Sequence, residues 1–451
     1  MEIRLTGTGG RGGWPQPHCR CASCERARSA GRRRAPAQVL VDGVLRIDSG
    51  RTPVCGPDVR HRGDGTGGGD VTAGVAGYRV KRVPGGWDIT GPDGGRLLVG
   101  NGHGGGRGGG HGATTAPPDG TGRYATEPYD IALLDLLENP AQLGALRRRG
   151  LVHARTVVAV LHADHRAPSE EELARRCQFW GVIVPHDGDV LVTPGTVTPG
   201  TATPGTATPG TATPGTATPG TATPGTATPG TATPGTATAR PVSAGSGPGR
   251  PRRVLVLGGA RSGKSRHAEL RLAAEPRVTY LAAGPYPAGA QPAADSDWTE
   301  RVAAHRARRP PWWQTVESVD AAGTLRSGSG AVLFDGAGTW LAAVMDESGA
   351  WADGDGDGDG DGDGDAGPGG SAGLARAQAQ IAAKVDELLE AWRQTRALVV
   401  AVSDEVGSSV HPPTRAGRLF RDQLGWLNQR LAAESEETVL MVAGRALTLP
   451  S

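Results

Sequence analysis

The 451-residue sequence has few cysteines, no long apolar run and almost no net charge. Five cysteines, three of them in CRCASC, do not make the framework of a secreted disulfide-rich protein. No stretch approaches the roughly 20 apolar residues that a membrane-spanning helix needs, and the first 25 residues contain no apolar signal-peptide core. A formal net charge of +2 provides no strong field toward nucleic acid or membrane lipid. We therefore expect a soluble, cytoplasmic protein with no nucleic-acid partner and no membrane span.

Glycine and proline are abundant, with 73 and 35 residues, and two repetitive segments hold many of them. The first, Thr193 to about Ala239, repeats TATPG, a pattern that excludes a helix, a central strand and an apolar core. The second, Asp353–Asp365, alternates Asp with Gly, and its like charges favour a solvated loop over a calcium site. We predict two domains at 1–192 and 251–451, a disordered linker at 193–250, and a disordered insertion at 353–370.

The N-terminal part has the pattern of short strands with one clear helix. Alternating apolar residues predict strands in EIRLTGTGG, VLVDGVLRID, WDITGPDGGRLLVG, YDIALLDLL and TVVAVLHADH. Asp42-Gly43 and Pro92–Gly95 predict hairpin turns within the second and third of these stretches. A capping box from Ser169 to Glu172 predicts a helix in PSEEELARRCQFWG. This mixture predicts a small, strand-rich α/β domain.

The pattern after the linker alternates strands with helices. An apolar face of Ile381, Val385, Leu388, Leu389 and Trp392 has helical spacing. Strands alternating with helices predict an α/β fold whose mostly parallel sheet is covered on both faces. We expect strands at 254–257, 278–282, 331–334, 398–402 and 439–442, and further helices at 264–275 and 415–433.

A phosphate-binding motif lies in VLVLGGARSGKSRHAE. Gly258-x-x-x-x-Gly263-Lys264-Ser265 matches the P-loop pattern, between an apolar strand and helix-forming residues. In such a loop the backbone N–H groups point at phosphate oxygens, the lysine reaches the β- and γ-phosphates, and the serine ligates Mg²⁺. A glycine-rich turn without a ligand is the alternative. The predicted nucleotide contacts are Gly258, Gly259, Ala260, Arg261, Ser262, Gly263, Lys264 and Ser265.

Two further segments add candidate groups. Asp335 ends the apolar run AVLFD, where a strand-end carboxylate would position Mg²⁺, or alternatively would cap a helix. In AAHRARRP, His305 stands among Arg306, Arg308 and Arg309. This segment is either a solvated basic helix end or an anion cradle with an imidazole nucleophile.

Four segments in order resemble the bifunctional adenosylcobinamide kinase/adenosylcobinamide-phosphate guanylyltransferase family. They are GGARSGKSRHAE, RVAAHRARRPPWWQTVE, VSDEVGSSVHPPTRAGRLFRDQLGWLNQRLA and VAGRALTL, within about Val254–Leu449. The resemblance implies a P-loop α/β fold, a trimer, and a corrinoid substrate in cobalamin biosynthesis. It implies phosphorylation of the aminopropanol hydroxyl of adenosylcobinamide with ATP or GTP. Transfer of GMP from GTP would then give adenosylcobinamide-GDP and pyrophosphate.

The resemblance also implies roles for individual residues. His305 falls on the histidine that attacks the α-phosphate of GTP and forms a histidine–GMP intermediate, with Lys264 and Asp335 as further catalytic groups. Glu317 would accept hydrogen bonds from guanine N1–H and the amino group. The remaining nucleotide contacts implied by the resemblance fall on Ala282, Ala283, Gly284, Arg306, Ala307, Arg308, Arg309 and Asp335.

Three positions depart from the family pattern. Asp404 stands where the family usually has Asn, Gly336–Trp340 replaces a Cys-Leu-Thr type segment, and Ala283 lacks a hydroxyl that is often present. These changes leave two alternatives open, a catalytically decayed nucleotide- or zinc-binding scaffold and a P-loop kinase of another small alcohol. If His305 is not the nucleophile, either His267 or His411 takes that role, or the transfer is direct.

The N-terminal segments LTGTGG, PHCRCASC and AVLHADH resemble a truncated metallo-β-lactamase fold, in the branch with cyclic phosphodiesterases of phosphonate metabolism. Cys19, Cys21 and Cys24 supply three thiolates, one ligand short of tetrahedral zinc. The resemblance implies His165 as the fourth ligand of a structural Zn²⁺, with His162 as the alternative; three surface thiols without metal are the other interpretation. The catalytic H-x-H-x-D-H signature is absent, and His61 and Asp64 lack its other members. We therefore expect no hydrolase activity.

Overall fold

A computed structural model describes residues 1–48, 54–55, 77–101, 127–193, 252–283, 306–351, 368–408 and 411–450. His61, Asp64, Gly284 and His305 lie outside the described residues, as do the predicted linker after Thr193 and most of the predicted Asp-Gly insertion. Across the described ranges, no helix combines the length and the apolar character needed to cross a bilayer.

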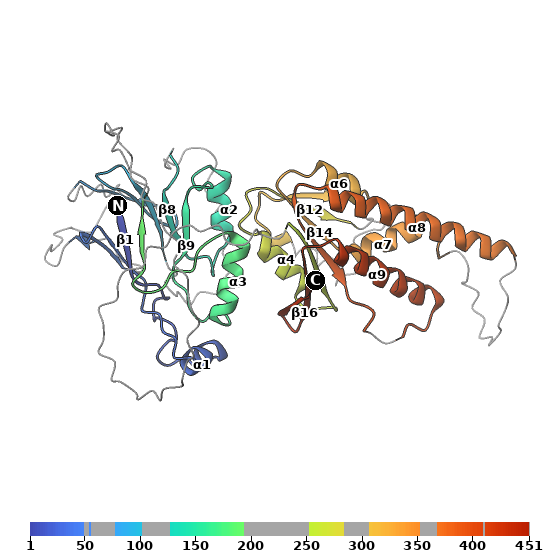
Figure 1. Cartoon of the computed structure of the whole chain (residues 1–451), viewed down its shortest axis with the longest axis horizontal. Helices are drawn as coiled ribbons and strands as arrows, with labels where there is room; N and C mark the ends of the chain where they lie inside the picture. The colour runs from blue at the N-terminus through green and yellow to red at the C-terminus, as the bar shows by residue number, and fades with distance from the viewer. Residues whose placement is uncertain are drawn as a thin grey trace, which may run out of the picture.

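Two five-stranded sheets pack face to face in the N-terminal half (Figure 1). The order of the first sheet is β10-β1-β2-β3-β4 and that of the second is β5-β6-β7-β8-β9. Alternating side chains such as Ile3, Leu5, Val39 and Val41 face the second sheet because successive residues of a strand point to opposite sides. The strands are β1 (Glu2–Gly7), β2 (Gln38–Val41), β3 (Leu45–Asp48), β4 (Val54–Cys55), β5 (Arg79–Val83), β6 (Gly86–Thr90), β7 (Arg96–Gly100), β8 (Ile131–Leu134), β9 (Val157–Val160) and β10 (Val190–Val192).

Three helices belong to a second apolar cluster in this half, together with the other face of β7–β9. They are α1 (Ala22–Ser29), α2 (Ala141–Arg148) and α3 (Glu170–Trp180). Ser169 caps α3 by accepting a hydrogen bond from the Glu172 amide at 3.2 Å. The Glu172 carboxylate instead pairs with Arg175 and Arg176, so only one half of the predicted capping box is present.

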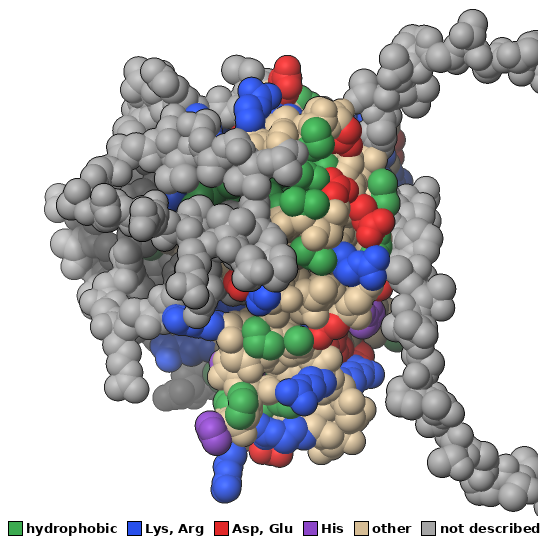
Figure 2. Space-filling model, turned by 90° about the vertical axis from the view of Figure 1, so that its left-hand side faces the viewer, with side chains coloured by type: hydrophobic (Ala, Val, Ile, Leu, Met, Phe, Trp, Pro, Cys, Tyr) green, Lys and Arg blue, Asp and Glu red, His purple; other side chains and the backbone are tan. Residues whose placement is uncertain are grey.

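On the surface shown in Figure 2, basic and acidic side chains of the described residues are interspersed.

The C-terminal half contains a seven-stranded sheet in the order β13-β12-β14-β15-β11-β16-β17. Every neighbouring pair is parallel except β16 and β17. The strands are β11 (Arg253–Gly258), β12 (Val278–Ala282), β13 (Gln314–Glu317), β14 (Ala331–Asp335), β15 (Leu398–Asp404), β16 (Glu437–Val442) and β17 (Arg445–Leu449). The predicted mostly parallel sheet is confirmed.

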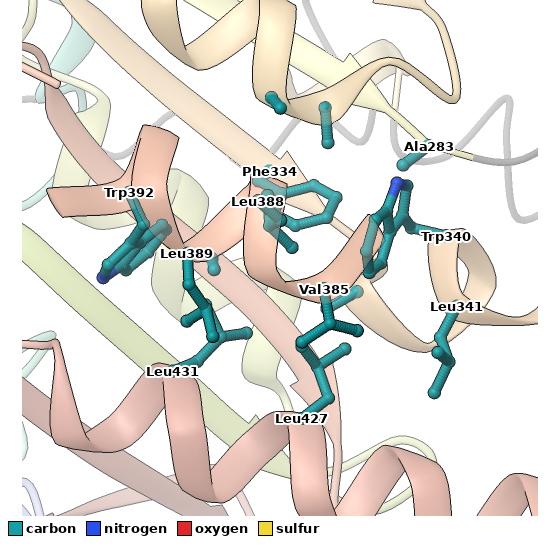
Figure 3. Close-up of a cluster of buried hydrophobic side chains, with 14 of the residues drawn as sticks. Ala283, Phe334, Trp340, Leu341, Val385, Leu388, Leu389, Trp392, Leu427 and Leu431 are labelled. Carbon is teal, nitrogen blue, oxygen red and sulfur yellow. The ribbon is translucent and has the colours of Figure 1, made fainter. Parts of the chain in front are cut away.

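Helices cover both faces of this sheet, because its central strands are apolar on both sides. One face carries α6 (Ala321–Ser327), α7 (Ala337–Glu347), α8 (Pro368–Gln394) and α9 (Arg415–Ala433). Figure 3 shows Val385, Leu388, Leu389 and Trp392 of α8 in this cluster, with Leu427 and Leu431 of α9. The opposite face carries α4 (Lys264–Leu272). The α8 helix begins at Pro368, inside the range expected for the Asp-Gly insertion.

The two halves make direct contact through α2 and α3 on one side and α4 on the other (Figure 1). The indole Nε1 of Trp180 donates to the Leu270 carbonyl oxygen at 2.9 Å, and Trp180 is fully buried. The α2 helix approaches the end of α4 so closely that a Cβ on Gly144 would lie 2.9 Å from the Ala273 carbonyl oxygen. The helix that follows the P-loop is therefore part of a contact between the halves, which no local sequence pattern indicates.

Candidate functional site

The P-loop joins β11 to α4 at the carboxyl edge of the parallel sheet. Gly263 immediately precedes α4 with φ 94°, a left-handed conformation that glycine adopts without steric cost. A Cβ on Gly258 would lie 2.5 Å from the Ser262 hydroxyl and 2.9 Å from the Met441 carbonyl oxygen, so a side chain does not fit there. Backbone conformation thus requires glycine at position 263, and close packing requires it at position 258.

Ser265 and Asp335 come together beside this loop. The Ser265 hydroxyl donates to Oδ1 of Asp335 at 3.2 Å, and the Tyr280 hydroxyl donates to Oδ2 at 2.6 Å. The residue that precedes α7 as its N-cap is Gly336, so the alternative in which Asp335 caps this helix is wrong. A serine hydroxyl and a strand-end carboxylate are hard oxygen donors of the kind that Mg²⁺ prefers, and this pair fits that cation.

A cation and a phenol extend the same network. The guanidinium of Arg309 lies over the Tyr280 ring, 3.1 Å from its centroid. Burial raises the pKa of Tyr280, and the Asp335 carboxylate that its hydroxyl contacts raises it further. Burial also lowers the pKa of Arg309. The chain Arg309–Tyr280–Asp335–Ser265 therefore connects the arginine-rich segment to the P-loop helix.

A second connection joins the arginine-rich segment to α4. Arg308 Nε donates to Oε2 of Glu269 at 2.9 Å, and the Glu269 side chain is only 9% exposed. Arg306 Nη2 lies 3.2 Å from Oε1 of Glu317, at the end of β13, and both side chains are exposed. The Lys264 ammonium lies 2.7 Å from Oδ1 of Asp404.

The remaining predicted nucleotide contacts are distributed as follows. Ala282 ends β12 next to Asp335 of β14, and Ala283 is buried directly after it. Ala307 lies in an exposed helical turn with Arg306. The backbone of Arg261 has φ 56°, so the loop takes a left-handed turn at a residue that is not glycine.

The two alternative histidines are placed differently. His267 lies on α4 and is buried against Phe179 of α3, with ring centroids 5.6 Å apart. Burial, Arg271, Arg175 and Arg176 lower its pKa to about 3. His411 is exposed, just before α9. Burial of His267 between two helices is incompatible with an attack on a phosphate in the P-loop without rearrangement.

The N-terminal cysteines form a compact group with one histidine. One potential ligand atom from each of Cys19, Cys21, Cys24 and His165 lies within 4.8 Å of all the others. Nδ1 of His165 is 3.3 Å from the Cys19 sulfur and 3.7 Å from the Cys24 sulfur. Cys21 is the N-cap of α1, and a hydrogen bond from the Cys24 amide lowers its pKa. Three sulfurs and one imidazole nitrogen match the donor set of a structural zinc site.

His162, the alternative fourth ligand, does not join this group. Its side chain is buried and its backbone has φ 63°. Its Nε2 lies 3.3 Å from the carbonyl oxygen of Gly100, the last residue of β7. Burial lowers the pKa of His162. Geometry therefore favours His165 over His162 at the cysteine group.

Comparison with known proteins addresses the C-terminal half. A sequence model of the cobinamide kinase/cobinamide phosphate guanyltransferase family matches residues 254–449. The bifunctional adenosylcobalamin biosynthesis protein CobU of Salmonella typhimurium is 33% identical over 195 residues, 42% of this chain and 96% of the relative. The chain belongs to this family. CobU of Escherichia coli matches with the same identity and coverage, and CobP of Pseudomonas aeruginosa is 35% identical over 203 residues, 44% of this chain and 96% of that protein.

The N-terminal half of this CobU-family chain lies outside the family match. A comparison of structures finds Zn²⁺-bound PqqB from Methylobacterium extorquens, at 16% identity and a TM-score of 0.24. That match covers 43% of this chain and 100% of the PqqB chain. A TM-score this low does not establish a common fold.

Two site residues, Tyr280 and Glu269, are not indicated by the sequence patterns. Tyr280 lies in an apolar strand, where its period-2 position gives only a signal for burial. Glu269 lies at i+5 from Lys264 on α4, and the sequence carries no signal of its burial, since an acid on a helix is mostly exposed. Asp404 was noticed as a departure from the family pattern, without a structural role.

Proposed function

We propose that the C-terminal half phosphorylates adenosylcobinamide and then transfers GMP to adenosylcobinamide phosphate. The observation that carries this proposal is the contact of Ser265 with Asp335 beside a complete P-loop, in a chain that aligns with 96% of the length of CobU. ATP or GTP serves the first reaction and GTP the second. Mg²⁺ held by Ser265 and Asp335 would neutralise part of the negative charge of the phosphates when bound.

In the kinase step, the P-loop amides and Lys264 hold the triphosphate. The substrate hydroxyl oxygen bonds to the γ-phosphorus, the bond to the β–γ bridging oxygen breaks, and the hydroxyl proton is released. The products are adenosylcobinamide phosphate and a nucleoside diphosphate. No covalent enzyme intermediate is required, so this step depends on positioning and charge stabilisation by the loop.

In the guanylyl step, the family resemblance assigns the nucleophile to His305. Its imidazole nitrogen bonds to the α-phosphorus of GTP and pyrophosphate leaves; a phosphate oxygen of adenosylcobinamide phosphate then displaces the histidine and gives adenosylcobinamide-GDP. Arg306, Arg308 and Arg309 supply positive charge for the departing pyrophosphate. Glu317, paired here with Arg306, is the group suited to the guanine donors.

Incubation with α-labelled GTP tests the guanylyl step at single residues, and transfer of label from γ-labelled nucleotide to adenosylcobinamide tests the kinase step. The wild-type protein should acquire acid-labile, base-stable label, and His305→Ala should lose labelling and adenosylcobinamide-GDP formation while retaining much of the kinase activity. Lys264→Ala should impair both reactions. His411→Ala, which changes an exposed histidine before α9, is the control and should behave as wild type. Near wild-type formation of adenosylcobinamide-GDP by His305→Ala would refute the assignment of the nucleophile.

We further propose that Cys19, Cys21, Cys24 and His165 bind a structural Zn²⁺ in a domain of truncated metallo-β-lactamase type. The four donor atoms within 4.8 Å support the site. Purified protein should contain about one zinc per chain, and Cys21→Ser or His165→Ala should remove it and lower the melting temperature of the N-terminal half. Cys177→Ala, a buried cysteine of α3 outside the group, should retain zinc. A metal-free wild type with the same melting temperature after chelation would refute the site.

The resemblance to the family also leads us to propose a homotrimer in the cytoplasm. Light scattering on the purified chain measures the number of subunits directly, and a monomer at micromolar concentration would contradict this proposal.

A further inference from the structure

The lysine of the P-loop is paired with a carboxylate of the neighbouring strand. Asp404 is the last residue of β15 and lies in register with Gly258, the first glycine of the loop. Its Oδ1 is 2.7 Å from Nζ of Lys264, which also donates to the Gly259 carbonyl oxygen at 3.3 Å. The lysine side chain is 16% exposed and the carboxylate 42%. The Lys264 side chain therefore lies back over its own loop, held from β15.

The backbone on both sides of Asp404 is fixed. Asn428 Nδ2 donates to the Asp404 carbonyl oxygen at 3.0 Å, and its Oδ1 accepts a hydrogen bond from the buried Ser403 hydroxyl at 2.6 Å. The amide of Glu405 donates to the Gly258 carbonyl oxygen at 3.2 Å, which ties the end of β15 to the P-loop. Because both neighbours are anchored, the backbone of Asp404 is held at the carboxyl edge of the sheet beside the P-loop.

The negative charges beside Lys264 disfavour the binding of a metal-free nucleotide. A triphosphate brings several negative charges to Lys264, and it meets one carboxylate already paired with that lysine. Asp335 adds a second carboxylate on the neighbouring strand β14. A nucleotide that arrives with a divalent cation carries less negative charge, so the like-charge penalty from Asp404 is smaller for the complex than for the free nucleotide.

We propose that Asp404 is a specificity-determining residue that makes the P-loop accept nucleotide as its magnesium complex and discriminate against metal-free nucleotide. The proposal rests on the nucleotide site of the proposed function and adds a role for one residue within it. Before nucleotide binds, the carboxylate keeps Lys264 over the loop; when the magnesium complex binds, the phosphates take the lysine, and the cation compensates for the remaining charge of Asp404.

The test compares GTP binding by wild type and Asp404→Asn, which removes the charge with almost no change of shape. Dissociation constants are measured by calorimetry in EDTA and in excess MgCl₂, on the full-length protein. We expect Asp404→Asn to bind metal-free GTP at least about tenfold more tightly than wild type, with a change of less than about threefold for the magnesium complex. The preference for the magnesium complex should therefore shrink.

Glu405→Gln is the matched control, because it removes a carboxylate one residue away whose Oε1 accepts from the Gly407 amide. It should keep the wild-type constants in both buffers. Equal metal-free affinities for wild type and Asp404→Asn would overturn the proposal. Weakening of the magnesium complex by about tenfold or more would also overturn it, because Asp404 would then help to hold the cation. If wild type binds GTP in neither buffer, the proposed function itself fails. Melting temperatures of all three proteins verify that each is folded.

Discussion

The ring of Phe179, on α3, meets the imidazole of His267, on α4, edge to face with centroids 5.6 Å apart. Arg271 of α4 also lies over the Phe179 ring, 4.1 Å from its centroid. Since α4 begins with Lys264, this contact connects the N-terminal half to the helix that carries the P-loop lysine and serine.

Acid should weaken the contact between α3 and α4. Burial and three neighbouring arginines lower the pKa of His267 from 6.5 to about 3, so the folded protein keeps this imidazole neutral. Between these pH values the unfolded chain binds a proton that the folded chain does not, and stability therefore falls as pH falls below about 6.5. We expect His267→Leu to flatten this part of the curve of melting temperature against pH. His411→Leu, at an exposed position, should leave the curve unchanged.

Gly144 should be required for the close approach of α2 to α4. Alanine normally stabilises a helix by up to about 1 kcal/mol relative to glycine, but a Cβ here would lie 2.9 Å from the Ala273 carbonyl oxygen. We expect the two halves to remain associated in size-exclusion chromatography after proteolysis near Arg240 in the wild type, and to separate in Gly144→Ala. Gly425→Ala on α9, where no atom of the described residues lies within 4 Å of an added Cβ, is the control and should not separate them.

Glu269 should position the arginine-rich segment. Its Oε2 lies 2.9 Å from Nε of Arg308, and Glu269→Gln removes the negative charge that holds this guanidinium against α4. We expect guanylyl transfer to fall about 10- to 100-fold, as misplaced catalytic groups do, while the kinase kcat changes much less. Arg308→Lys should give an intermediate loss, since it keeps the charge without the planar fork. Equal losses in both reactions would indicate a general defect of α4 instead.

Arg166 should stabilise the N-terminal half. It contacts the carboxylates of Asp135, Glu138 and Asp164 at 3.1, 3.1 and 2.8 Å. Burial raises the pKa of Asp135, whose side chain is 6% exposed, and Arg166 opposes this effect. We expect Arg166→Met to cost about 3–5 kcal/mol at pH 7.

Part of this loss should be recovered at pH 5. In Arg166→Met the folded protein binds a proton at Asp135 more readily than the unfolded chain does, so its stability rises as pH falls. Urea unfolding at both pH values measures the difference. The exposed pair Arg393–Glu434 offers a control, because Arg393→Met should cost little at either pH.

Local patterns were enough to predict most of the C-terminal elements. The helix at Arg415–Ala433 and the strand at Val278–Ala282 have the expected bounds, because each combines a clear apolar period with a stop signal. The strands β13 and β17 and the helices α6 and α7 were missed. The α7 segment begins in GAGTW, whose two glycines disfavour a helix, whereas burial of Trp340 and Leu341 stabilises the helix.

The sequence by itself determined the P-loop, the strand-end Asp335 and the cysteine group, because each depends on residue types at short, fixed spacing. Only the tertiary structure decided three other matters. It selected His165 rather than His162 for the cysteine group, brought Asp404 within 2.7 Å of Lys264, and placed α3 against α4. Each of these contacts joins residues that are distant in the chain, and side-chain direction after folding decides which groups meet. Periodicity indicates the face of an element on which a side chain lies, but not which distant residue it meets there.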